Sequence, residues 1–174
     1  MGEENKMHSD ILPVWIIMGV SGCGKTTVGK LWASELKIPF YDADDFHPPE
    51  NISKMSSGTA LTDDDRFPWL EQLGALIIMI SRNKGGVLAC SALNELYRNY
   101  LQPGGHPVHF VYLKANKELI KERLSKRKGH FMPDVLIDSQ FEALEEPETG
   151  VTIDASKPTD EILDILREEY GREG

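Results

Sequence analysis

The chain has 174 residues, which is enough for one domain with a buried core and short for two. Its formal net charge of −9 argues against nucleic acid as the main partner, because phosphate backbones are bound by clustered Lys and Arg. Two cysteines, Cys23 and Cys90, make neither a disulfide framework nor a CxxC metal site, so we expect a reducing, cytoplasmic setting.

Nothing in the sequence predicts a membrane segment. The longest apolar run, around 73–80, is too short to span a bilayer, and the first six residues lack a signal-peptide pattern. We expect residues 1–12 to form a disordered tail and residues 13–174 to form a single domain.

The first predicted strand, at 14–18, leads into a complete P-loop motif, G-x-x-x-x-G-K-[ST]. Helical spacing of apolar residues follows at 27–36, so the motif stands between a strand and a helix, as phosphate binding requires. We predict that the loop binds a nucleoside triphosphate, with Lys25 on the β- and γ-phosphates and the Thr26 hydroxyl on magnesium. The nucleotide-binding residues are Gly19, Val20, Ser21, Gly22, Cys23, Gly24, Lys25, Thr26 and Thr27. The alternative is a glycine-rich turn that binds nothing.

Strands and helices alternate through the rest of the chain. A short strand is predicted at 38–42, a polar stretch of turn-forming residues at 44–65, and a helix at 68–82. Strands at 87–90, 109–113 and 150–153 alternate with helices near 94–100, 117–127, 133–144 and 159–170. This pattern predicts an α/β fold with a parallel sheet covered on both faces, in three α/β/α layers.

Two acids, Asp42 and Asp44, follow the second predicted strand. Ligands of open parallel sheets lie at the carboxyl ends of the strands, and side chains two apart in a strand point the same way. We therefore place both carboxylates near the γ-phosphate, with Asp44 as general base and Asp42 on the metal side. A solvated acidic turn is the alternative.

Two arginines, Arg123 and Arg127, lie four apart on the predicted helix at 117–127, and hence on one face. We predict that they belong to a small lid over about 117–136, with Gly129 and Pro133 as hinge and return. Guanidinium groups brought in by a lid stabilise the charge of the transferred phosphoryl group and exclude water. A solvated basic helix face is the alternative.

Separate sequence blocks at 19–26, 42–48, 51–55, 61–70, 89–93, 129–133 and 139–147 together resemble the gluconokinases, relatives of the shikimate and adenylate kinases. The resemblance implies a P-loop fold like that of the nucleoside monophosphate kinases. It also implies ATP-dependent phosphorylation of D-gluconate to 6-phospho-D-gluconate, with Mg2+ as cofactor and a homodimer as the common assembly.

The resemblance also implies the residues of the substrate side. Lys54 and Arg66 would supply positive charge to the carboxylate end of gluconate, and Asp44 would take its 6-hydroxyl. Further polyol contacts would come from His47, Ser91 and Gln140. Each of these has a plainer alternative: a surface lysine, an ion pair of Arg66 with a nearby acid, a turn histidine, a helix cap, or a surface amide.

Two other functions stay open at this stage. One is a related kinase with shikimate or a nucleoside monophosphate as acceptor, since a P-loop and lid arginines are shared by these enzymes. The other is a nucleotide-controlled switch, although the sequence at 116–119, Asn-Lys-Glu-Leu, lacks the acid of a guanine-reading motif.

Overall fold

The computed structural model describes residues 10–127 and 134–171. In chain order the elements are β1 (Val14–Met18), α1 (Lys25–Leu36), β2 (Phe40–Asp42), a 3-10 helix η1 (Ala43–Phe46), α2 (Pro49–Ser56), α3 (Asp63–Ser81), β3 (Gly86–Ala89), α4 (Glu95–Tyr100), β4 (Val108–Lys114), α5 (Lys117–Ser125), α6 (Asp134–Ala143), β5 (Val151–Asp154) and α7 (Thr159–Tyr170).

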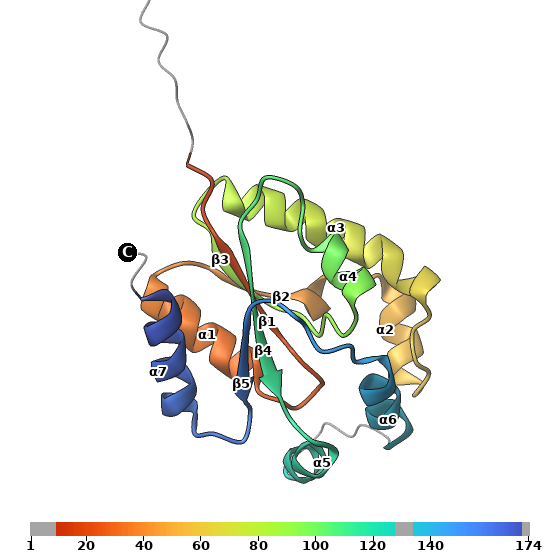
Figure 1. The fold of residues 1–174 in the computed structure, drawn as a ribbon. Coiled ribbons are helices and arrows are strands. Elements are labelled where there is room, and N and C mark those ends of the chain that lie inside the picture. The colour runs from red at the N-terminus through yellow and green to blue at the C-terminus, as the bar shows by residue number, and fades with distance from the viewer. Residues whose placement is uncertain (1–9, 128–133, 172–174) are drawn as a thin grey trace, which may run out of the picture.

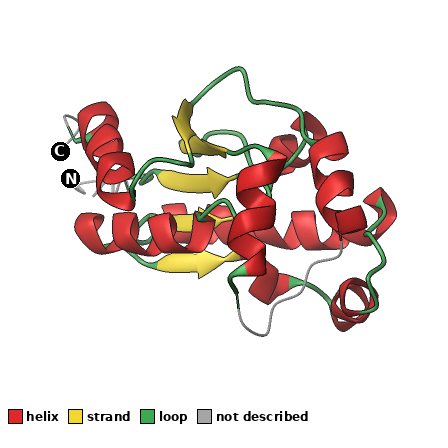
Figure 2. Ribbon diagram, turned by 90° about the horizontal axis from the view of Figure 1, so that it is seen from below, coloured by secondary structure: helices red, strands yellow, loops and turns green. Residues whose placement is uncertain are grey.

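The five strands form one sheet in the order β2-β3-β1-β4-β5, and every neighbouring pair is parallel. Helices α1 and α7 cover one face of the sheet, and α3 and α4 cover the other (Figure 1). The view turned by 90° about the horizontal axis also shows helices on both sides of the strands (Figure 2). The predicted three-layer α/β/α architecture is therefore confirmed, and β1 lies at its centre.

Alternate residues of β1 belong to different cores, as the period of two in a strand requires. Ile17 packs with Val28 of α1 and Leu166 of α7, whereas Ile16 packs with Leu70 and Ile77 of α3. All of these side chains are buried. Burial on both faces explains why the strand reads as a continuous apolar run.

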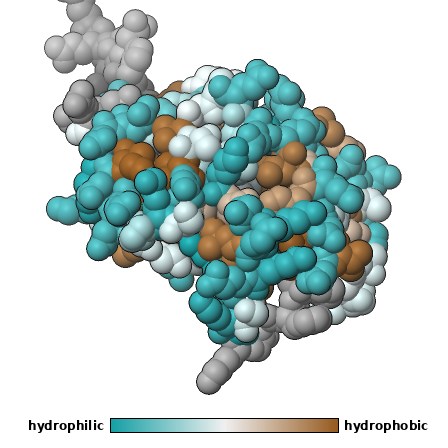
Figure 3. All heavy atoms as spheres, turned by 60° about the horizontal axis from the view of Figure 1, so that its bottom comes forward, coloured by the Kyte–Doolittle hydropathy of each residue, from teal (hydrophilic) through white to brown (hydrophobic). Residues whose placement is uncertain are grey.

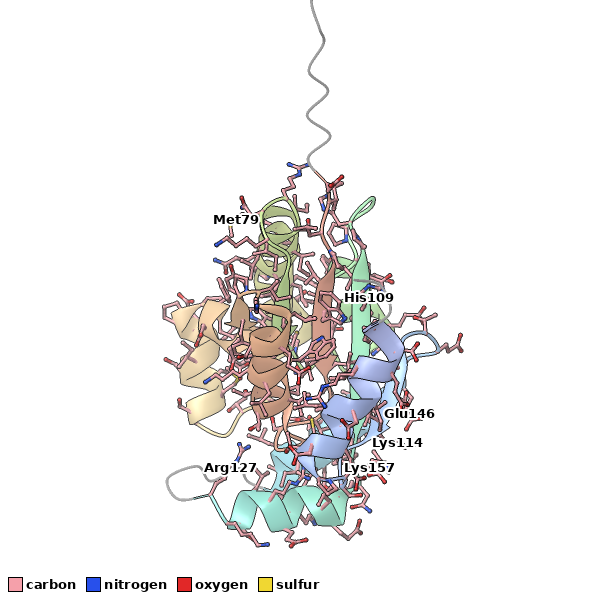
Figure 4. All side chains as sticks on the ribbon, turned by 90° about the vertical axis from the view of Figure 1, so that its left-hand side faces the viewer. Met79, His109, Lys114, Arg127, Glu146 and Lys157 are labelled. Atoms are coloured by element: carbon pink, nitrogen blue, oxygen red, sulfur yellow. The ribbon has the colours of Figure 1, made fainter. Side chains whose placement is uncertain are left out.

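An aromatic cluster closes the α1 and α7 side near the amino end of β1. Trp15 packs edge-on against Trp32, with ring centroids 6.2 Å apart. His109 and Tyr170 complete the cluster, at 5.3 Å and 6.0 Å from the Trp15 ring. His109 lies near the opposite end of the sheet from α5 (Figure 4).

The stretch at 44–65 differs from the prediction, because it contains η1 and the two-turn helix α2. Helix α2 begins with Pro49 in its first turn, where the missing N–H does no harm, and it buries only Asn51. Helix α3 begins five residues before the predicted start. Its N-cap is Thr62, which forms a capping box with Asp65 and leaves Pro68 inside the helix.

The predicted disordered tail falls mostly on residues 1–9, which lie outside the described residues. Leu12, by contrast, is anchored, since its N–H donates to the Ser81 carbonyl at 2.8 Å. Within the described ranges, no helix combines the length and the apolar character needed to cross a membrane.

Candidate active site

A cleft of about 570 Å³ lies at the carboxyl ends of the central strands. It is lined by most of the predicted site residues: Ser21, Gly22, Gly24, Lys25, Thr26, Thr27, Asp42, Asp44, His47, Arg66, Ser91, Arg127 and Gln140. Seen from the α5 and α6 end, the surface is largely hydrophilic and its apolar side chains form separate spots (Figure 3). The structure thus brings together residues that are up to 119 positions apart in the sequence.

The P-loop wraps around the amino end of α1. Gly22 and Gly24 have φ angles of 84° and 107°, which glycine adopts without strain. Helix α1 has no side-chain cap and no acidic residue in its first turn, so its positive end is suited to an anion. The Lys25 ammonium group donates to the carbonyls of Gly19 and Val20 at 2.9 Å and 3.0 Å, and it lines the cleft.

The other predicted nucleotide-binding residues, Gly19, Val20 and Cys23, stand behind the surface of the loop. The Val20 and Cys23 side chains are buried in the core between the sheet and α1. Any contact of Cys23 with phosphate would therefore be made by its backbone.

Thr26 and Asp42 lie side by side in the lining of the cleft. The Thr26 hydroxyl is 3.5 Å from Oδ2 of Asp42, and Oδ1 of Asp42 accepts the N–H of Asp44 at 3.0 Å. The described residues hold no group of three or more His, Cys, Asp or Glu that could hold a metal. A hydroxyl and one carboxylate fit Mg2+, which in kinases takes its remaining ligands from water and from substrate phosphates.

Asp44 lies in η1, so the strand alternation expected for it ends at Asp42. Even so, both acids line the cleft. The Asp44 side chain is 83% exposed to water, and it lies inside the cleft rather than on an outer surface. Partial desolvation, followed by the charges of Asp42 and Asp45, raises the pKa of Asp44, while Lys25 opposes the rise. A carboxylate with a raised pKa is a better proton acceptor, as a general base requires.

His47 is the C-cap residue of η1, as its turn alternative expected, and its ring is also a wall of the cleft. Its side chain is 4% exposed and stacks on Trp69, with ring centroids 4.1 Å apart. Burial, followed by the nearby charge of Arg66, lowers the pKa of His47 to about 4, although Asp42 opposes this shift. The imidazole is therefore neutral at pH 7.

Arg66 projects from α3 into the cleft, and its position is fixed from α4. Its guanidinium donates to the Tyr97 hydroxyl at 2.9 Å and lies over the Tyr97 ring at 5.2 Å. The Tyr97 hydroxyl in turn donates to Asp63 at 2.5 Å. Arg66 reaches an acid only through Tyr97 in these contacts, so the plainer alternative of a direct ion pair does not describe them.

Lys54 differs from its expected place. Its ammonium group forms a 2.6 Å ion pair with Oδ2 of Asp65, the same oxygen that accepts the Thr62 N–H in the capping box. Lys54 is not among the described residues that line the cleft. The structure thus gives Lys54 a role in joining α2 to the start of α3.

Arg123 also differs from the prediction. Its guanidinium donates to the carbonyl of Cys23 at 2.9 Å and to that of Ala155 at 2.5 Å, so it pins α5 to the P-loop. Ile120 and Leu124 of α5 pack against Gly22 on the same side. Helix α5 is therefore held against the P-loop in this structure, and the start of the lid at 117 stays a prediction.

Arg127, at the end of α5, does line the cleft, and its side chain points away from α5 toward the body of the domain (Figure 4). The predicted hinge and return, Gly129 and Pro133, lie outside the described residues. Leu136 of α6 lines the cleft again where the description resumes.

Both ends of the Gln140 amide, on α6, form hydrogen bonds with Ser21 of the P-loop. Its Oε1 accepts the Ser21 N–H at 2.7 Å, and its Nε2 donates to the Ser21 hydroxyl at 2.9 Å. Ser91 lines the cleft, and its carbonyl accepts the N–H of Gly19 at 3.2 Å. The N-cap of α4 is Asn94, so Ser91 is no helix cap.

Sequence reasoning missed residues that support the site from behind. Arg98 is buried, and its guanidinium donates to the carbonyls of Ala92 and Glu145 at 2.8 Å and 2.9 Å. It thereby ties the loop after β3 to the segment after α6. Tyr97 and Asn51 were likewise missed as supports. The one available signal was that Asn51, Tyr97 and Arg98 fall within or beside the blocks of the family resemblance.

Comparisons with known proteins identify the family of the chain. A family model described as shikimate kinase matches residues 21–148. The chain is 48% identical over 135 residues to the thermosensitive gluconokinase of Escherichia coli strain K12, covering 77% of this chain and 72% of that protein. It is 44% identical over 177 residues to a probable gluconokinase of Xenopus tropicalis, covering 90% and 93% of the two chains.

Among solved structures, a gluconokinase from Sinorhizobium meliloti 1021 superposes with a TM-score of 0.80 at 38% identity, over 94% of this chain and 98% of that one. The identities and coverage extend well beyond the P-loop. The chain therefore belongs to the gluconokinases, within the wider family that the shikimate kinase model describes.

Proposed function

We propose that this chain transfers the γ-phosphoryl group of ATP to the 6-hydroxyl of D-gluconate, giving ADP and 6-phospho-D-gluconate. The observation that carries the proposal is one cleft in which the P-loop and Lys25 face an acid, Asp44, and a cation, Arg66. The identity with gluconokinases of several organisms supports gluconate as the acceptor.

The transfer step needs little covalent chemistry from the protein. Asp44 accepts the proton of the 6-hydroxyl as its oxygen bonds to the γ-phosphorus, and the bond to the β,γ-bridging oxygen breaks to release ADP. Lys25 exchanges the carbonyls of Gly19 and Val20 for the β- and γ-phosphates. Thr26 and Asp42 would hold Mg2+, which supplies positive charge to the phosphate oxygens when bound.

Arg127 is the cation that we propose to meet the transferred phosphoryl group. It lines the cleft beside the P-loop and is exposed, so it can move toward the phosphates. Arg123 acts at one remove in this scheme, because its bonds to Cys23 and Ala155 keep the P-loop against α5.

On the acceptor side we propose that Arg66 binds the carboxylate of gluconate, and that His47, Ser91 and Gln140 contact its hydroxyls. All four line the cleft, and a half-buried guanidinium suits a carboxylate because both are planar. Lys54 would act here through its ion pair with Asp65, which holds α2 at the edge of the cleft.

The competing acceptors are shikimate and nucleoside monophosphates, and the competing function is a nucleotide switch. A coupled assay of ADP release with gluconate, shikimate, AMP and no acceptor separates them. We expect release that depends on gluconate. Activity with shikimate or AMP alone would show that gluconate is not the acceptor. Hydrolysis of ATP that is independent of any acceptor would favour a nucleotide switch over a kinase.

The family resemblance also leads us to propose a homodimer, and residues 13–174 as a single kinase domain. Two free, buried cysteines support a reducing, cytoplasmic setting. Light scattering during size-exclusion chromatography tests the dimer, and a monomer across micromolar concentrations would contradict it.

A further inference from the structure

The ring of His47 is held in one plane by a tryptophan that is itself fixed. The Trp69 ring lies 4.1 Å from it at an interplanar angle of 15°. The Trp69 Nε1–H donates to the Ala43 carbonyl at 2.8 Å, so the indole cannot rotate without losing a buried hydrogen bond. Only the edges of the imidazole are left to make directional contacts.

One edge of the imidazole faces Asn51 of α2, whose amide orientation is determined by a second neighbour. The Asn51 Nδ2 donates to the Asp65 carbonyl at 2.9 Å, and a carbonyl oxygen can only accept. The same Nδ2 lies 3.4 Å from Nδ1 of His47. Since the amide nitrogen carries two hydrogens, the second is available to Nδ1, which must then be the acceptor.

A neutral imidazole that accepts at Nδ1 carries its proton on Nε2. Burial, followed by the nearby charge of Arg66, lowers the pKa of His47, which keeps the ring neutral at pH 7. Nε2 lies 3.7 Å from Oδ1 of Asp44. That separation exceeds a hydrogen bond by less than an ångström, so a small movement of the exposed Asp44 side chain is enough to form one.

We propose that Asn51 and Trp69 are positioning residues that lock His47 as its Nε2–H tautomer, and that this N–H donates to Oδ1 of Asp44 when gluconate is bound. The donated bond would fix the carboxylate so that Oδ2 faces the 6-hydroxyl. His47 would then act at the reacting end of the acceptor. The hydrogen bond from His47 to Asp44 rests on the proposed kinase function, whereas the tautomer of His47 does not.

The tautomer is tested directly by nitrogen-15 NMR of the histidine side chains in the intact chain at pH 7, without substrates. We expect the His47 signals to show a protonated Nε2 and an unprotonated Nδ1, with the assignment made from their loss in His47→Gln. His106, in the loop before β4, and His109, on β4, should be unchanged in that variant. A protonated Nδ1, or an imidazolium ring, overturns the inference even if the chain phosphorylates gluconate.

The role of the support is tested with Asn51→Leu, which is similar in volume and donates nothing. We expect mixed His47 tautomers and a kcat lowered by about ten- to a hundredfold, the usual effect of losing a hydrogen bond to a charged group. The KM for ATP should be unchanged. Asn83→Leu is the matched control, because Asn83 also bonds a helix carbonyl but is exposed and remote.

A second pair of variants keeps the test decisive if Asn51→Leu does not fold. His47→Gln retains an N–H near the position of Nε2, whereas His47→Phe retains only the flat ring against Trp69. We expect His47→Gln to keep a clearly higher kcat than His47→Phe. Equal kcat values, or a change confined to the KM for gluconate, would show that His47 contacts only the remote polyol and would overturn the proposal.

A chain that releases no ADP with gluconate would refute the kinase function and leave the tautomer result standing. A gluconate kinase with the opposite tautomer would refute the inference alone. The two failures are therefore distinguishable in the same set of samples.

Discussion

Arg66 owes its direction in the cleft to a tyrosine on a different helix. Tyr97 is buried, and its hydroxyl joins Arg66 to Asp63 while its ring lies beneath the guanidinium. Burial, followed by the hydrogen bond to Asp63, raises the pKa of Tyr97, so the hydroxyl stays neutral. A cation aimed in this way can bind a carboxylate without first being ordered.

We therefore expect Tyr97→Phe, which keeps the ring and removes the hydroxyl, to raise the KM for gluconate by about tenfold. The kcat and the KM for ATP should change little, because the phosphoryl-transfer groups are untouched. Steady-state kinetics with each substrate varied in turn measures this. Tyr100→Phe on the same helix is the control, and an equal rise in the KM for ATP would contradict the assignment of Arg66 to the acceptor.

Asp44 offers the sharpest test of the chemistry. Asp44→Asn is nearly isosteric and cannot take a proton, so we expect kcat to fall on the order of 10²–10⁴-fold. Binding of ATP, measured by titration calorimetry, should be nearly unchanged. If the main change is instead in the magnesium dependence of the rate, the roles of Asp42 and Asp44 are exchanged.

At the scale of single residues, the sequence could predict side chains that belong to a motif and could not predict their partners. Lys25, Thr26, Asp42 and Asp44 follow strands at the sheet edge where ligands bind, and the cleft contains all four. Asn51 and Tyr97 act on residues 4 and 31 positions away through contacts that depend on how α2, α3 and α4 pack. No periodicity in the sequence encodes such contacts.

At the scale of elements, α2 and α3 are joined by the ion pair of Lys54 and Asp65. The hydrogen bond from Lys54, followed by the one from the Thr62 N–H, lowers the pKa of Asp65 to about 2. A carboxyl with a lowered folded-state pKa stabilises the fold above its unfolded pKa, near 3.8, and loses that stabilisation as pH falls through about 2.

We accordingly expect Lys54→Met to unfold at lower urea than the wild type at pH 7, and the difference to shrink as pH falls from about 4 toward 2. The KM for gluconate should rise only modestly. Urea titrations followed by circular dichroism across this range measure the first effect. If Lys54→Met and the wild type are equally stable at pH 7 while the KM for gluconate rises strongly, Lys54 contacts the substrate after all.

Helix α5 and Arg127, which lies two residues beyond its end, have separate roles. Arg123 is bonded to two carbonyls, whereas Arg127 is exposed at the cleft. We expect Arg127→Ala to lower kcat more than it weakens ATP binding, since a guanidinium that mainly meets the transition state contributes little to the ground state. Single-turnover kinetics with fluorescent nucleotide titration measures both, and unchanged turnover would remove Arg127 from the mechanism.

The misplaced boundaries have physical reasons. Pro68 reads as a helix start, since proline favours the first turn, but the capping box of Thr62 and Asp65 begins α3 earlier and the helix tolerates Pro68 in its second turn. Helix α2 has only eight residues, and its two large apolar residues, Ile52 and Met55, are exposed, so its apolar pattern is too short to predict a helix from the sequence.

At the scale of the whole molecule, alternation of strands and helices was enough to predict a parallel sheet with two covered faces. The order β2-β3-β1-β4-β5 was not predicted, because it depends on which distant strands meet. That order puts β1 at the centre, so the P-loop emerges between β3 and β4 and the acceptor wall can form on one side of it. The resemblance to gluconokinases supplied the substrate, which packing alone does not reveal.

The positions of the tryptophans have an optical consequence. The chain has three, and only Trp69 lines the cleft, whereas Trp15 and Trp32 share the aromatic cluster near the amino end of β1. Replacing that pair by phenylalanine would leave a single indole against His47 as an intrinsic fluorophore. Gluconate should then change the emission of Trp69 at a concentration set by its own binding constant, and a spectrum indifferent to gluconate would mean that the acceptor binds elsewhere. The two tryptophans that would add background fluorescence thus lie away from Trp69, the indole that can report on acceptor binding.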